Sequence, residues 1–173
     1  MTDAAFEAYV FDCVRRRPAD LQWHEQLMGA AVGLVGQATR LIRAAQSCGD
    51  RSGREEQMRL QEIARQIEFY RALLYYQLDV RPAPVAPRSL DADASPLAQL
   101  ARAAKQVAIR AGILSSTAND LLNCPSDISD ANIQSALTAF EQARAEFLER
   151  IGVSPERLWI DAASVPQSGS RLH

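Results

Sequence analysis

Hydrophobic residues between Leu27 and Ala45 recur at steps of three and four positions, which is typical of a helix buried along one side. The stripe consists of Leu27, Ala31, Leu34, Ala38, Leu41 and Ala45. It predicts an amphipathic helix over about residues 21–46. A second stripe predicts another helix over about residues 54–78, and its members are Leu60, Ile67, Tyr70, Leu74 and Leu78. The two segments together predict a helical hairpin.

The same two patterns occur again 73 positions later in the chain. The first stripe is repeated by Leu100, Ala104, Val107, Ala111 and Leu114. The second is repeated by Ile133, Phe140, Ala143, Phe147 and Ile151. Spaced self-similarity of this kind indicates a structural unit used twice. We therefore expect a second hairpin, with helices over about residues 97–122 and 130–151.

The segments outside the two hairpins predict shorter features. Residues 4–17 have a helical pattern, and a short helix is expected over about 154–163. Pro82, Pro84, Pro87 and Pro96 exclude a continuous helix between the hairpins and indicate an extended linker. The predicted division is a first repeat with its N-terminal helix at 1–81, a linker at 82–96, a second repeat at 97–163, and a flexible tail at 164–173.

Almost no part of the chain has the alternating period of a strand, so the predicted fold class is all-α. Each hairpin alone exposes one apolar face, which the other hairpin can cover. We therefore predict that two tandem hairpins pack as a four-helix-type bundle. Its core is predicted to contain Leu34, Leu41, Ile67, Leu74, Val107, Leu114, Phe140 and Phe147.

Composition and charge narrow the function classes. The chain has 173 residues, of which 47% are hydrophobic and 23% are charged, as in an ordinary globular protein. A net charge of −2 provides no general attraction for nucleic acids or anionic membranes, so neither is predicted as a partner. The longest uncharged run, Gln26–Thr39, is shorter than the roughly 20 residues of a membrane span.

The cysteines favour a reducing compartment. Cys13, Cys48 and Cys124 are odd in number and widely spaced, which is not a disulfide framework or a zinc motif. Asp3 and Glu7 stand where a secretory signal would be basic. We therefore predict a cytoplasmic protein.

Several segments resemble the MazG-like all-α nucleoside triphosphate pyrophosphohydrolases, a superfamily that includes the dimeric dUTPases. They are the helix around Phe6 and Tyr9, then Gly33–Arg40 (GLVGQATR), Glu62–Tyr70 (EIARQIEFY), Leu78–Val80 (LDV) and, in the second copy, Ile151–Leu158 (IGVSPERL). The resemblance implies a MazG-like bundle. Because members of that family usually complete the bundle with a second chain, it also implies that the tandem copies form a pseudo-dimer within one chain. We accordingly expect a monomer or a weak homodimer.

The family's catalysis depends on two acidic pairs, Glu-x-x-Glu and Glu-x-x-Asp, that hold Mg²⁺ against the triphosphate. In the first copy the matching positions are Gln37, Arg40, Glu62 and Arg65. In the second copy they are Arg110, Ile113, Ser135 and Thr138. Aligning Gly112 with Gly33 instead replaces the first two by Ser116 and Asn119. One carboxylate of four remains in the first copy and none in the second.

The missing carboxylates predict a site without catalytic residues, metal or other cofactor, with Mg²⁺ needed only if activity has survived. The resemblance then implies a non-catalytic nucleotide-binding or regulatory module. Arg40, Glu62 and Arg65 are the candidate ligand-binding residues, because two arginines in place of metal ligands can hold a phosphate directly. The simpler interpretation of Glu62 and Arg65 is an ion pair on the helix surface.

Two alternative functions stay open at this point. One is an active pyrophosphohydrolase with relocated acids, for which Glu55, Glu56, Glu62 and Glu68 are the reservoir. The other is a helical assembly or interaction protein.

Glycines and tyrosines within the first repeat each have two interpretations. Gly29, Gly33 and Gly36 share one helix face, and each costs about 1 kcal/mol relative to Ala. Close approach of a neighbouring helix or the floor of a ligand pocket would explain that cost. The tyrosines of the second helix are Tyr70, Tyr75 and Tyr76. Their rings would either pack in the core and at its rim or form a platform on which bases stack.

Overall fold

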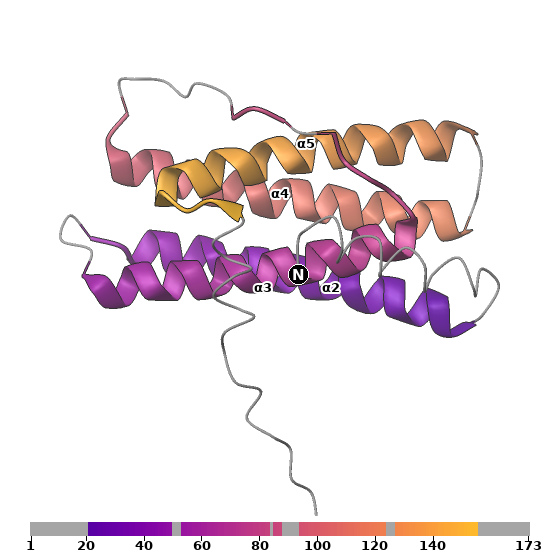
Figure 1. The fold of residues 1–173 in the computed structure, drawn as a ribbon, viewed down its shortest axis with the longest axis horizontal. Coiled ribbons are helices and arrows are strands. Elements are labelled where there is room, and N and C mark those ends of the chain that lie inside the picture. The colour runs from indigo at the N-terminus through magenta and orange to yellow at the C-terminus, as the bar shows by residue number, and fades with distance from the viewer. Residues whose placement is uncertain (1–20, 50–52, 84, 88–93, 124–126, 156–173) are drawn as a thin grey trace, which may run out of the picture.

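The computed structural model describes residues 21–49, 53–83, 85–87, 94–123 and 127–155, and these form a bundle of four α-helices (Figure 1). The helices are α2 (Leu21–Ser47), α3 (Arg54–Leu78), α4 (Pro96–Asn123) and α5 (Asp127–Ile151). The all-α prediction is confirmed, and the four predicted helices begin and end within three residues of the observed bounds. The predicted helix at 4–17 and the tail at 164–173 lie outside the described residues, as does most of the predicted helix at 154–163.

The helices form two hairpins, α2 with α3 and α4 with α5, which lie one above the other in Figure 1. The central helices α2 and α4 pack against each other extensively, and each also packs against the second helix of its own hairpin. The outer helices α3 and α5 make few contacts with each other. The apolar stripes of α2 and α4 therefore form the middle of the core.

The predicted core is confirmed, because all eight of its side chains are buried. Alanines alternate with leucines along the buried stripes of α2 and α4, and Ala31, Ala38, Ala104 and Ala111 are fully buried. Small side chains at such positions allow neighbouring helix axes to approach closely. Large side chains from all four helices fill the rest of the core, among them Leu34, Leu74, Leu114 and Phe140.

The two hairpins end in the same way. Asp79 after α3 and Gly152 after α5 adopt the left-handed conformation, with φ of 52° and 66°. At each end the backbone N–H groups of that residue and of the next one, Val80 or Val153, donate to carbonyls of the last helical turn. This arrangement stops a helix and satisfies its final carbonyl groups. The sequence repeat therefore extends to hydrogen bonds at equivalent positions.

Side chains at equivalent positions also connect the two helices of each hairpin. The Gln77 amide on α3 donates to Gln26 Oε1 on α2 at 3.1 Å, and the Arg150 guanidinium on α5 donates to Gln99 Oε1 on α4. The indole N–H of Trp23 additionally donates to the Gln77 carbonyl oxygen at 2.9 Å. These bonds hold the start of one helix beside the end of the next.

The structure separates the three glycines of α2. A Cβ on Gly33 would lie 2.2 Å from Cε1 of Tyr70, so this glycine permits the close approach of α3, which is the first of the two interpretations. A Cβ on Gly29 or on Gly36 would have no described atom within 4 Å, and both residues are exposed. No helix of the described structure therefore packs closely on these two positions.

Within the described residues, no helix combines the length and the apolar character that crossing a membrane requires.

Candidate functional site

A buried group of four charged side chains joins α3 to α5. Arg71 on α3 donates from Nε to Glu141 Oε1 at 2.6 Å, and Arg144 on α5 donates from NH2 to Glu68 Oε2 at 2.7 Å. Both pairs are bidentate, and Arg144 also donates to Glu141 at 3.1 Å. Glu68 and Arg71 recur 73 positions later as Glu141 and Arg144. Each ion pair therefore joins the arginine of one hairpin to the glutamate of the other, and the two pairs occupy equivalent positions. We call these four residues the ion-pair quartet.

Tyr75 adds one bond that has no counterpart in the second hairpin. Its hydroxyl donates to Glu141 Oε1 at 2.7 Å, and the Arg71 guanidinium lies 4.7 Å from the centre of its ring. Burial raises the pKa of the Tyr75 hydroxyl, and the nearby Glu141 carboxylate raises it further. Leu148 occupies the equivalent position on α5. The interpretation of Tyr75 as a core residue is confirmed, because it is buried and bonded inside the bundle.

The ion pairs of the quartet keep Glu141 and Arg144 charged. Burial alone would raise the pKa of the Glu141 carboxyl, but Arg71 and Arg144 outweigh it, so the pKa is lowered. Burial alone would lower the pKa of Arg144, yet the Glu68 carboxylate raises it overall. Both residues are therefore held in their charged forms. Because Glu68 and Glu141 are buried and saturated by arginines, they serve the packing of α3 on α5 and are closed to a substrate.

The candidate residues of the first copy lie on the outside of the first hairpin. On α3, Arg65 and Glu62 form an ion pair at 2.7 Å, so the simpler interpretation of these two residues is confirmed. On α2, Arg40 donates to Gln37 Oε1 at 3.1 Å. Arg40 and Glu62 are exposed, and each pair lies within a single helix. Their prediction as ligand-binding residues stays a prediction.

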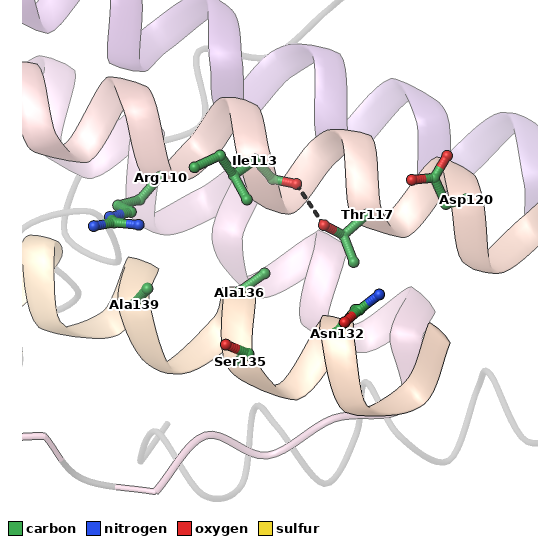
Figure 2. A pocket seen from close by; sticks show the side chains of 8 residues that line it. All are labelled: Arg110, Ile113, Thr117, Asp120, Asn132, Ser135, Ala136 and Ala139. Carbon is green, nitrogen blue, oxygen red and sulfur yellow. Dashed lines mark hydrogen bonds between the residues drawn. The ribbon is translucent and has the colours of Figure 1, made fainter. Parts of the chain in front are cut away.

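The matching positions of the second copy line a pocket between α4 and α5. Arg110 and Ile113 enter it from α4 and Ser135 from α5, whereas Thr138 is not among its lining residues (Figure 2). The pocket has a volume of about 280 Å³. Its remaining lining residues are Thr117, Asp120, Asn132, Ala136 and Ala139.

The pocket has a cation at one end and a carboxylate at the other. Arg110 and Asp120 lie ten residues apart on α4, roughly 15 Å at the rise of an α-helix, and Figure 2 shows them at opposite ends. Neither has an ion-pair partner in the part of the chain that the structure describes. The Thr117 hydroxyl donates to the Ile113 carbonyl oxygen at 2.8 Å, which leaves its oxygen as an acceptor. The site can thus bind an anionic group at Arg110 and a donor group at Asp120.

Differences in side-chain length distinguish this pocket from the equivalent surface of the first hairpin. There Glu62 accepts bonds from Arg65 and from Gln66, and these long side chains extend over the helix surface. The equivalent residues of α5 are Ser135, Thr138 and Ala139, which are short. Sequence reasoning missed the contributions of Asp120 and Asn132, and comparing side-chain sizes between the repeats would have been the signal for this pocket.

The reservoir of relocated acids does not converge on one site. Glu68 is buried in the quartet, whereas Glu62 is exposed and paired with Arg65. No three His, Cys, Asp or Glu residues gather as a potential metal site within the described ranges. Cys48 is buried, and its thiol donates to the Ala44 carbonyl oxygen at 3.3 Å.

Comparison of the chain with protein-family models, with curated proteins and with solved structures finds no match. The fold and its surface define an all-α helical bundle with a polar pocket, and the MazG-like resemblance stays a prediction from the sequence.

Proposed function

We propose that this chain is a non-catalytic module that binds a nucleotide or another phosphate compound in the pocket between α4 and α5. The observation that carries the proposal is Arg110, a guanidinium without an ion-pair partner in the described structure, at a position where the resembled family holds its metal. The proposal includes a MazG-like fold whose two copies act as a pseudo-dimer. It also includes a cytoplasmic location and a monomeric or weakly dimeric state.

Arg110 favours a phosphate group because a guanidinium presents several N–H donors in a planar fork that matches phosphate oxygens. Ser135, which lies between Ala139 and Asn132 along α5 in Figure 2, adds a hydroxyl to the middle of the pocket. At the other end, Asp120 and Asn132 can accept hydrogen bonds from the hydroxyl or amino groups of a nucleoside. The volume of about 280 Å³ lies just below the roughly 300 to 1,000 Å³ of typical ligand pockets, so the pocket favours a ligand no larger than a mononucleotide.

The same lining argues against hydrolysis. Magnesium that acts on phosphates is usually held by carboxylates together with the substrate, and the resembled family uses four of them. Asp120 is the single carboxylate among the residues that line this pocket. We therefore expect the ligand to bind directly to protein donors, without Mg²⁺.

The first copy is the alternative location for the same ligand chemistry. Arg40, Glu62 and Arg65 remain candidates there, and Nε of Arg65 is a buried donor without a hydrogen-bond partner among the described residues. Because Glu62 already pairs with Arg65, an anion would have to displace that bond. The pocket of the second copy requires no such displacement.

A thermal-unfolding screen tests the proposal. Inorganic phosphate and nucleoside mono-, di- and triphosphates are added in the presence and in the absence of Mg²⁺. A ligand that binds the folded state should raise the unfolding midpoint to the same extent with and without Mg²⁺. Arg110→Ala should abolish the rise, and Arg40→Ala, which tests the alternative location in the first copy, should preserve it.

A hydrolysis assay on the same nucleotide panel decides between a binding module and an enzyme. We expect no Mg²⁺-dependent turnover above background. Turnover that disappears in Glu62→Gln or in Asp120→Asn would replace the proposal with the alternative of relocated acids. If no compound shifts the midpoint at millimolar concentration, the binding proposal fails and the assembly alternative is favoured.

A further inference from the structure

One face of α2 is exposed and has nothing packed on it in the described structure. We call it the α2 outer face, and it consists of Glu25, Gly29, Val32, Gly36 and Arg43. Spacings of four, three, four and seven residues place all five on one stripe of the helix. Val32 is 64% exposed, which is the largest exposure among the large hydrophobic residues of the described chain.

The two glycines of this face have no neighbour among the described residues that would explain them. Glycine inside a helix is unfavourable relative to alanine, and a helix usually retains it where something must come close. Gly33, on the inner side, meets that condition through Tyr70. Gly29 and Gly36 have no described atom within 4 Å of an added Cβ. Both favour a close contact that the described part of one chain does not supply.

The residues of the α2 outer face match those of a second, antiparallel copy of the same face in size and in charge. If a second copy lies antiparallel with the two helices crossing near Leu34, Val32 faces Gly36 of the second copy. The same geometry places Glu25 beside Arg43 of the second copy. Each contact then occurs twice, as in any interface with twofold symmetry. In the described structure Glu25 and Arg43 have no ion-pair partner, so both charges are free for this contact.

The equivalent face of α4 lacks this property, although the two helices are repeats of each other. Its residues are Ala98, Arg102, Lys105, Ile109 and Ser116. It contains two cations and no acid, so antiparallel pairing would form no opposite-charge contact between the copies. Ile109 stands at the position equivalent to Gly36, and its side chain fills the space that a side chain of a second helix would need. The self-complementary pattern belongs to α2 alone of the two central helices.

We propose that two copies of this chain associate through their α2 outer faces, in an antiparallel contact with Val32 against Gly36 and Glu25 against Arg43. A contact between single helices buries less surface than a stable dimer interface, so the association should be weak and dependent on concentration. The contact is independent of the pocket between α4 and α5, and its failure would not affect the proposed ligand.

Sedimentation velocity over a series of protein concentrations measures the association. Val32→Glu should remove the dimer because it places charges at the crossing point of the two helices. Ile109→Glu, on the equivalent face of α4, should leave the dimer unchanged. Both positions are exposed, and circular dichroism at low concentration checks that each variant remains folded.

Charge reversal tests the orientation of the two copies. Glu25→Arg alone and Arg43→Glu alone should each raise the dissociation constant about fivefold or more, because each creates two like-charge contacts. The double variant should return the dissociation constant toward the wild-type value. Restoration is specific to an antiparallel pairing of these two positions.

Replacing Gly29 and Gly36 together by Ala distinguishes an effect on dimerisation from an effect on the stability of the monomer. The monomer should unfold at a higher temperature because alanine favours the helix, while the dissociation constant should rise because the added methyl groups hold the copies apart. The proposal is overturned if the wild-type chain is a monomer up to millimolar concentration. It is also overturned if Ile109→Glu disrupts a dimer that Val32→Glu leaves intact.

Discussion

The first and second hairpins share their interior and differ on their outer surfaces. The core stripes, the left-handed residues after α3 and α5, and the two halves of the ion-pair quartet recur at equivalent positions. On the outside, paired long side chains at Glu62 and Arg65 contrast with Ser135 and Thr138. Packing restricts the interior of a repeat, whereas its surface is free to change. The differences between the repeats therefore indicate where a function specific to one copy is located.

The largest effects should come from breaking the quartet that the hairpins share. Arg71→Met and Arg144→Met each leave a buried carboxylate without its main partner, and each should lower the free energy of unfolding by about 3 to 5 kcal/mol. Urea denaturation measures both. Losses below about 1 kcal/mol would show that water reaches the quartet and solvates the carboxylate that has lost its arginine.

The shared core should respond similarly in both hairpins. Leu74 and Phe147 are equivalent buried residues of α3 and α5, and replacing either by Ala should cost about 2 to 5 kcal/mol through lost burial and a cavity. Denaturation of the two variants under identical conditions makes the comparison. A large cost in one and almost none in the other would mean that the hairpins do not share one core.

Acid should weaken the contact between the hairpins. The pKa of Glu141 is lower in the folded chain than its ordinary value of about 4.3. Its contribution to stability is therefore complete above the unfolded-state pKa and is lost as the pH falls through the folded-state pKa. Unfolding midpoints between pH 7 and pH 3 should fall for the wild type. For Glu141→Gln they should start lower and fall less steeply, and parallel curves would exclude Glu141 as a source of the pH dependence.

Transferring the first hairpin's surface to the second should have the smallest effect on stability. Ser135→Glu with Thr138→Arg reproduces the Glu62 and Arg65 pair on α5, where an exposed ion pair contributes only about 0.2 to 1 kcal/mol. Ligand binding in the pocket should nevertheless fall at least tenfold, because a new carboxylate enters the pocket and repels an anionic ligand. Calorimetric titration and urea denaturation of the same variant measure the two effects, and undiminished binding would place the ligand elsewhere.

Helix ends and core residues were predictable because they depend on local signals. Period-3.6 stripes marked the buried sides, and glycines and prolines marked the breaks, so the structure confirms α3 with the predicted bounds Arg54–Leu78. The quartet was missed because Glu68 and Arg71 also fit a surface ion pair three residues apart. Their recurrence as Glu141 and Arg144, next to buried positions, was a usable signal for a buried charge network.

The pocket was less predictable because it results from the absence of long side chains on α5. Its space depends on short side chains at Ser135 and Ala139, and no periodicity reports the volume between two helices. Arg110 was identified as a position of the family's metal site, but its lack of an ion-pair partner emerges only when its neighbours are placed. The different surroundings of the three glycines of α2 likewise required the structure, because close helix packing and a pocket floor were both open for all three.

Calorimetric titration of a nucleoside monophosphate in metal-free buffer tests the central claim most directly, with the wild type, Arg110→Ala and Arg40→Ala compared at one salt concentration. We expect saturable binding to the wild type and to Arg40→Ala, and at least a tenfold loss of affinity in Arg110→Ala. Equal binding to all three proteins, or binding that appears only with Mg²⁺, would contradict a phosphate site at the α4–α5 pocket.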